Sequence, residues 1–120
     1  KVPLHNHGQP YRNWLHADDT AEAVFTIIDK GDVGEIYNIA GGFEQSNFDT
    51  VRSVFDSMGI DISDGGKENK HIDYSYSRPG QDVRYSLDDS KLRSLGWSPK
   101  KLFSKEIMSI VGYYKHKFIW

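Results

Sequence analysis

The sequence predicts a mixed α/β (α+β) fold, in which helices and strands alternate along a single domain of 120 residues. Two observations lead to this prediction. Apolar residues recur at the spacing of amphipathic helices in several stretches. Short runs rich in aromatic and β-branched residues lie between those stretches. The expected order is strand, helix, strand, helix, strand, helix, helix, which is typical of α/β or α+β domains.

The first predicted unit follows an irregular start and consists of a strand at residues 11–16 and a helix that ends at Gly31. Asp18 or Asp19 can cap this helix, and a glutamate follows Asp19 at the spacing of a capping box. A second strand is expected at residues 35–39, so the three elements could form one crossover unit. That second strand is apolar on both faces, as inner strands of parallel sheets are. Its neighbours are not obvious in the chain, which suggests a missing half.

The later elements are shorter and are marked by caps, turns and glycines. In order, they are a helix capped by Ser46 and closed by Gly59, a polar loop at residues 60–70, a strand at residues 71–77, a turn at Pro79–Gly80, a short helix capped by Asp88 or Asp89 and closed by Gly96, and a long helix after Pro99.

Charge and composition exclude several classes of partner. The chain has 15 basic and 17 acidic residues and a net charge of −2, whereas a duplex-binding surface needs a net basic face. It has no cysteine, so disulfides and thiolate metal sites are excluded. It has no apolar run long enough to span a membrane and no apolar signal-peptide region. We therefore expect no nucleic-acid or membrane partner and a cytoplasmic location. The missing initiator methionine leads us to expect a piece of a longer chain.

Three short motifs are weak signals of chemistry. His5 to His7 spell HNH, but the ββα metal fold and further ligands of that nuclease class are not visible, so we predict a polar surface loop and no metal site. Tyr113 and Lys117 have the Y-x-x-x-K spacing of short-chain dehydrogenases, although a solvated helix end explains them better. The stretch IAGGF lacks the spacing of a dinucleotide-binding fingerprint.

A fourth signal is the set Arg12, Asn47 and Arg78, because each lies at a break between predicted elements. Asn47 lies at the start of a helix, where free N–H groups and the helix dipole favour an anion. Two arginines near such a terminus could grip a phosphate as a fork. The alternative, left open by spacing alone, is that Arg12 and Arg78 pair with surface carboxylates.

Four segments together resemble the dTDP-glucose 4,6-dehydratases of the extended short-chain dehydrogenase superfamily. They are GQPYRNWLHADDTAEAV, GEIYNIAGG, EQSNFDTV and RPGQDVRYSLDDSKLRSLGW. The resemblance covers nearly the whole chain and only the C-terminal portion of that family. It implies that residues 1–120 form one nucleotide-sugar-binding lobe, whose strand–helix–strand unit would complete a Rossmann sheet. The N-terminal NAD-binding half is absent.

The resemblance also implies roles for individual residues. Arg12, Asn47 and Arg78 match positions that contact the diphosphate of a nucleotide-sugar. His5 stands where the family usually has a tyrosine that lies against the base, and Gln81 stands where it usually has a histidine. No residue matches a catalytic position, and NAD belongs to the absent half. The parent enzyme would be a lyase, whereas this chain alone would be inactive.

Two further interpretations remain open from the sequence. UDP-sugar epimerases and UDP-glucuronate decarboxylases share much of the same pattern, so the chain could be a fragment of one of these. It could also be a stand-alone binding module that forms homo-oligomers through an exposed sheet edge.

Overall fold

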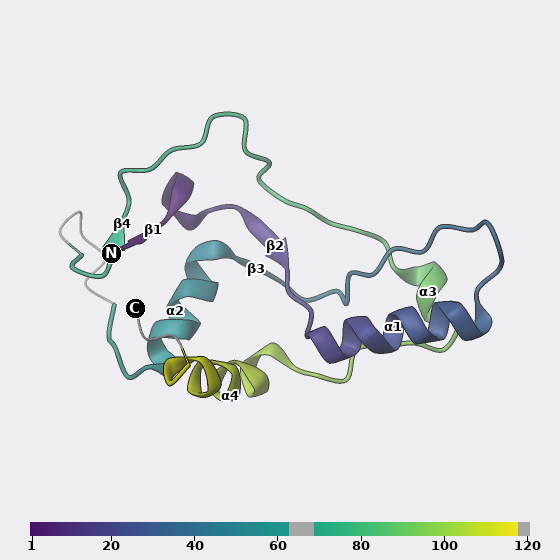
Figure 1. Cartoon of the computed structure of the whole chain (residues 1–120). Coiled ribbons are helices and arrows are strands. Elements are labelled where there is room, and N and C mark those ends of the chain that lie inside the picture. Colours follow the sequence, from purple (N-terminus) through teal and green to yellow (C-terminus); the bar gives the residue numbers. More distant parts are fainter. Residues whose placement is uncertain (63–68, 118–120) are drawn as a thin grey trace.

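The computed structural model describes residues 1–62 and 69–117 (Figure 1). Strands, helices and one 3₁₀ turn alternate along the chain, so the mixed α/β class is confirmed. The elements are β1 (Val2–Pro3), the 3₁₀ turn η1 (His5–Gly8), β2 (Tyr11–Asn13), α1 (Ala17–Lys30), β3 (Glu44–Ser46), α2 (Asn47–Ser57), β4 (Ile72–Asp73), α3 (Ser90–Ser94) and α4 (Phe103–Lys115).

The described strands form two separate pairs. β1 lies parallel to β4, with Val2 opposite Ile72. β2 lies antiparallel to β3, with Tyr11 opposite Ser46. The predicted crossover unit is therefore wrong, because residues 35–39 form no strand and β2 takes β3 as its neighbour. A strand requires a hydrogen-bonding neighbour, and the described part of the chain places none beside residues 35–39.

Helix α1 ends at Gly31, as predicted, but it begins differently. His16 occupies the cap position, and its Nδ1 accepts the N–H of Asp18 at 3.1 Å. Asp19, one of the two predicted caps, is only 1% exposed and lies inside the first turn. Its Oδ1 and Oδ2 accept the backbone N–H groups of Lys100 and Lys101 at 3.0 and 2.9 Å. Asp19 therefore does not cap α1, and its buried carboxylate connects α1 to the segment before α4.

The start of α2 confirms its predicted cap, since Ser46 Oγ accepts the N–H of Asp49 at 3.0 Å. Asp89 occupies the cap position of α3, but its carboxylate binds Arg93 and the N–H of Gly41 instead. The N–H of Ser90, the first residue of α3, instead donates to Asp88 Oδ1 at 2.9 Å. The predicted strand at residues 71–77 is reduced to β4, and part of the predicted loop at residues 60–70 lies outside the described residues.

Two small hydrophobic clusters replace a single core. The α2 cluster contains Leu4, Phe55, Ile62 and Ile72. The α1 cluster contains Ala23, Leu92 and Trp97, with Leu15, Ile27, Tyr37, Ile39 and Leu95 packed around them. The two clusters lie toward opposite ends of an elongated molecule of 53 × 35 × 23 Å, and α4 packs against α2 (Figure 1). The radius of gyration is 17.2 Å, whereas about 14 Å is usual for a compact domain of this length.

One face of the α1 end is bare and apolar. Phe25 and Ile28 on α1 are 70% and 75% exposed, and Ile36 in the segment that follows is 83% exposed. Large apolar side chains grouped in this way usually meet another surface.

In the described residues, no helix is both long enough and apolar enough to cross a membrane.

Candidate functional site

The predicted site residues lie on four parts of the chain that backbone hydrogen bonds connect. His5 lies on η1, Arg12 on β2 and Asn47 at the first position of α2, while Arg78 and Gln81 lie on the long connection between β4 and α3. Backbone hydrogen bonds join these segments. Tyr11 donates its N–H to Val83 O at 2.7 Å, and Asn47 donates its N–H to Pro10 O at 2.9 Å. The fold thus brings together residues that are far apart in sequence.

The β2–β3 pair brings the segments of Arg12 and Asn47 together. Tyr11 lies opposite Ser46 in the antiparallel pair, and Arg12 lies opposite Gln45. The N–H of Asn47, the first residue of α2, donates to Pro10 O directly beyond this pair. The start of α2 is therefore held beside the segment that carries Arg12. Arg12 and Asn47 are both half-buried, which leaves them accessible to a ligand.

The guanidinium of Arg12 is held by carbonyl oxygens and by an aromatic ring. Nη1 donates to Tyr11 O at 2.6 Å, and Nη1 and Nη2 both lie 3.3 Å from Asp82 O. The group also lies 4.4 Å from the centre of the Tyr85 ring. Within the described part of the chain, neither Arg12 nor Arg78 forms an ion pair with a carboxylate. Their charges are thus not cancelled by a direct partner there.

Tyr85 lies among charged side chains of the candidate site. A hydrogen bond to the Asp82 carboxylate raises the pKa of the Tyr85 hydroxyl, while the positive charges of Arg12 and Arg78 act in the opposite direction. Arg12 contacts the Tyr85 ring directly. The Arg78 side chain is exposed on the connection between β4 and α3, a few residues before Tyr85.

His5, Arg78 and Gln81 border this region. The N–H of Gln81 donates to Arg78 O at 3.3 Å across the Pro79–Gly80 turn, as the sequence predicts for that turn. The exposed His5 ring lies 5.6 Å from the Tyr76 ring at an angle of 44°. His5 and Tyr76 therefore form an aromatic pair on the segments that also carry Asn6 and Arg78.

Two further residues of this region, Asn6 and Tyr85, were not predicted from the sequence. Asn6 bonds to Arg78 and Gln81, and Tyr85 carries Arg12 on its ring. Each lies within a few positions of a predicted residue and has a polar group. Only their nearness in sequence to the predicted site residues could have indicated them. Nearness in sequence does not distinguish a side chain that contacts the site from one that is merely solvated.

The motifs judged weak have structural explanations. Lys117 donates to Tyr113 Oη at the exposed end of α4. The His7 ring stacks on Tyr74. In the described residues, no three His, Cys, Asp or Glu side chains are grouped so as to hold a metal ion. The stretch IAGGF lies in neither a helix nor a strand, whereas the phosphate-binding turn of a dinucleotide site joins a strand to a helix. This stretch therefore does not fit NAD.

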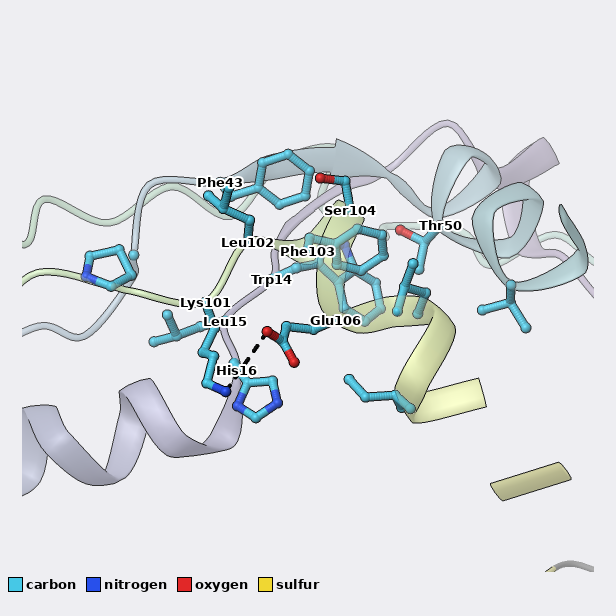
Figure 2. A pocket seen from close by; sticks show the side chains of 15 residues that line it. Trp14, Leu15, His16, Phe43, Thr50, Lys101, Leu102, Phe103, Ser104 and Glu106 are labelled. Atoms are coloured by element: carbon cyan, nitrogen blue, oxygen red, sulfur yellow. Dashed lines mark ion pairs between the residues drawn. The ribbon is translucent and has the colours of Figure 1, made fainter. Parts of the chain in front are cut away.

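A separate apolar cavity of about 440 Å³ lies between the end of β2, α2 and α4 (Figure 2). Its wall includes Trp14, Leu15, Phe43, Val54, Phe103 and Ile107. The Phe43 and Phe103 rings stack at 5.4 Å, and the Lys101–Glu106 ion pair lies at its rim. It contains none of the five predicted site residues. Few polar groups line it, so it offers few donors that could hold a charged nucleotide in one orientation.

Comparison with known proteins gives a consistent set of relatives. The family model described as GDP-mannose 4,6 dehydratase matches residues 1–110. The chain is 34% identical over 120 residues to dTDP-glucose 4,6-dehydratase 1 of Escherichia coli (strain K12), which covers 99% of this chain and 33% of the relative. A dTDP-glucose 4,6-dehydratase of Xanthomonas campestris is 35% identical over 122 residues, with 99% and 35% covered. The chain thus spans about one third of the length of these curated relatives.

Solved structures lead to the same group. The dTDP-glucose 4,6-dehydratase DesIV of Streptomyces venezuelae, determined with NAD and TYD bound, superposes with a TM-score of 0.83 at 34% identity, covering 96% of this chain and 34% of that one. UDP-glucose 4-epimerase of Thermotoga maritima, determined with UDP-glucose, gives a TM-score of 0.82 at 24% identity, covering 98% and 35%. The second likeness supports the fold alone. Both neighbours are extended short-chain dehydrogenases.

Proposed function

Since the chain belongs to the GDP-mannose 4,6-dehydratase family of extended short-chain dehydrogenases, we propose that residues 1–120 are the nucleotide-sugar-binding lobe of an NAD-dependent sugar-nucleotide 4,6-dehydratase. The proposed ligand is a nucleoside diphosphate sugar of the dTDP-glucose kind, as the names of the relatives suggest. The lobe corresponds to the C-terminal portion of that enzyme. It would bind and orient the ligand and would not perform the chemistry.

The observation that supports this proposal most strongly is that backbone hydrogen bonds connect the segments of Arg12, Asn47 and Arg78, while neither arginine forms an ion pair with a carboxylate among the described residues. A diphosphate spreads negative charge over several oxygens, so it needs more than one cation. Arginine offers a planar fork of donors that matches two phosphate oxygens. Asn47 can add its amide at the N-terminus of α2, where the helix dipole also favours an anion.

The base would lie at the other side of this site. The His5 ring is exposed beside Tyr76, and an aromatic or imidazole face can stack on any nucleobase. Gln81 carries a donor and an acceptor, so it can bond to a polar edge. Neither residue selects one base by itself. The preference for a thymine nucleotide therefore rests on the relatives and is part of the proposal.

Catalysis belongs, in this proposal, to a partner domain that supplies NAD and the acid–base residues. NAD would accept and return a hydride there, and the residues of this chain do not form its site. We therefore expect the purified chain to form no 4-keto sugar from dTDP-glucose. Detecting that product with a preparation free of host enzymes would contradict this part of the proposal.

The bare face of α1 and residues 33–36 is the proposed contact with that NAD-binding half. Its exposed apolar side chains have the character of an interior surface. Residues 35–39 form neither helix nor strand, and no strand lies beside them among the described residues, as would be so for an inner strand without its sheet. The alternative, a stand-alone module, would cover the same face with a second copy of the chain.

Calorimetry with dTDP and with thymidine tests the proposed site. Arg78→Ala should weaken dTDP binding by about 1.5–3 kcal/mol, the range for a charged hydrogen bond, and should hardly change thymidine binding. Arg52→Ala, which removes the same charge from the exposed side of α2, is the matched control and should leave both affinities unchanged. Equal dTDP affinity in the wild-type and Arg78→Ala chains would show that the diphosphate does not bind here.

A further inference from the structure

Asn6 uses one carboxamide to hold the backbone of Arg78 from both sides. Its Oδ1 accepts the N–H of Arg78 at 3.0 Å, and its Nδ2 donates to Arg78 O at 3.2 Å. The same Nδ2 donates to Gln81 Oε1 at 3.1 Å, and Oδ1 also accepts Ser77 Oγ at 3.3 Å. A single side chain from η1 thus contacts the Pro79–Gly80 turn at both of its ends.

The backbone of Asn6 has an uncommon conformation that restricts which residue can stand there. Its φ is 50° and its ψ is 40°, in the left-handed region. Glycine and asparagine adopt this region more readily than other residues. Of these two, only asparagine carries a donor and an acceptor on one planar group. Position 6 therefore meets a backbone requirement and a hydrogen-bonding requirement at the same time.

We propose that Asn6 is a positioning residue of the diphosphate site, which fixes the segment that carries Arg78 before the ligand arrives. This inference rests on the proposed function above. The Arg78 side chain is exposed, and the bonds from Asn6 fix the backbone from which it extends. A segment that is ordered before binding loses less conformational freedom when its cation meets the phosphate. Asn6 would act through Arg78 without touching the ligand.

The hydrogen bonds of Asn6 predict which ligands should bind more weakly when its side chain is removed. The paired bonds act on Arg78, so a ligand with a diphosphate should lose affinity when they are removed. A nucleoside has no phosphate and gains little from a fixed arginine. The ratio of dTDP to thymidine affinity is therefore a readout that general loosening of the fold would not shift in this direction.

Three variants of the 120-residue chain separate the side chain from the backbone. Asn6→Gly removes the carboxamide and keeps the left-handed conformation accessible. Asn6→Asp retains an acceptor for the Arg78 N–H and loses the Nδ2 donor. His7→Gly is the matched control, since His7 has a φ of 55° in the same turn and its ring stacks on Tyr74. Each chain is titrated with dTDP and with thymidine, and exchange of the Arg78 amide hydrogen is followed by NMR.

We expect Asn6→Gly to weaken dTDP about 3- to 10-fold, as for the loss of an ordinary hydrogen bond, with thymidine nearly unchanged and faster exchange of the Arg78 amide. Asn6→Asp should restore part of the amide protection, and His7→Gly should resemble the wild type in both readouts. Unchanged amide exchange in Asn6→Gly would refute the contact itself. Faster exchange with unchanged dTDP affinity would refute the positioning role while leaving the proposed function intact. If the wild-type chain bound no dTDP, the proposed function would fail and the positioning role with it.

Discussion

The two ends of the molecule use polar and apolar groups in opposite ways. At the α2 end, the apolar side chains of Phe55, Leu4 and Ile72 lie inside, and the arginines of the candidate site lie at the surface without carboxylate partners among the described residues. At the α1 end, a carboxylate, Asp19, lies inside and holds two backbone amides, while Phe25 and its apolar neighbours lie outside.

This contrast indicates two different kinds of surface on one small chain. Unpaired guanidinium groups at an open surface suit a small anion, since water and the ligand can exchange there. The exposed apolar face of α1 suits contact with another protein surface. The α1 end is held to the rest of the chain by the buried hydrogen bonds of Asp19, so the exposed apolar side chains are not needed for its internal packing. The four predictions below test the contrast, beginning with the largest expected effect.

Replacing a phenylalanine at each end of the molecule should give the largest difference in the free energy of unfolding. Phe55 is 8% exposed, so Phe55→Ala should lower the free energy of unfolding by about 3–5 kcal/mol, the usual cost of truncating a core phenylalanine. Phe25 is 70% exposed, so Phe25→Ala should change it by less than about 0.5 kcal/mol. Urea unfolding followed by circular dichroism measures both. Similar losses in the two variants would remove the distinction between the ends.

The buried carboxylate should matter more than its exposed neighbour. Asp19→Ala leaves two backbone N–H groups without their acceptor, and we expect a loss of about 3 kcal/mol in the free energy of unfolding. Asp18→Ala is the matched control, because the Asp18 side chain is 69% exposed and its ion-pair distances are 3.6 and 3.9 Å. A variant at position 19 as stable as the one at position 18 would show that the hydrogen bonds of Asp19 do not hold the α1 end.

Acid should weaken the α1 end through Asp89. The hydrogen bond from Arg93 lowers the pKa of the Asp89 carboxyl below its ordinary value of 3.8, with the Gly41 N–H acting in the same direction. A lowered folded-state pKa gives stability that is present above pH 3.8 and is lost as the pH falls through the folded-state pKa. Asp89→Asn should lose less stability than the wild type on acidification over this window, as measured by thermal unfolding at a series of pH values. Parallel pH profiles would contradict the assignment.

The smallest effect on stability should accompany a clear effect on association. Phe25→Ser combined with Ile28→Ser should leave the unfolding free energy within about 0.5 kcal/mol of the wild type, as exposed positions usually do. The apolar face would become polar, so concentration-dependent association in light scattering should fall. Asp29→Ser, on the same helix, is the control and should associate like the wild type. A wild-type chain that stays a compact monomer at high concentration would show that the face needs no cover in isolation.

Local signals in the sequence predicted what depends on neighbouring residues. Ser46 with Asp49 marked the start of α2, and Gly31 marked the end of α1, because caps are made within one turn. The strand expected at residues 35–39 was wrong, since a strand depends on a distant partner that periodicity cannot supply. The role of Asp19 was missed for the same reason, as its partners are Lys100 and Lys101.

The candidate site shows the same limit. Arg12 and Asn47 could be suspected from their places at element ends, but the hydrogen bond from Asn47 to Pro10 O that brings their segments together is visible only in the structure. Asn6 and Tyr85 were missed because their importance lies in contacts with residues about 70 positions away, as in the bond from Asn6 to Arg78. That the five residues bind a nucleotide stays a prediction, which rests on the resemblance.

The parallel pairing of β1 with β4 has a consequence for how the chain acquires its structure. Val2 takes its place only when Ile72 is available, and Tyr11 receives its partner Val83 later still. Closing such long loops slows folding, because chain entropy is lost before the contacts form. During synthesis, residues 2–3 can therefore pair only after residues 72–73 have emerged. We expect the arginine-bearing region to be the last to order, after α1 and α2 have formed from local contacts.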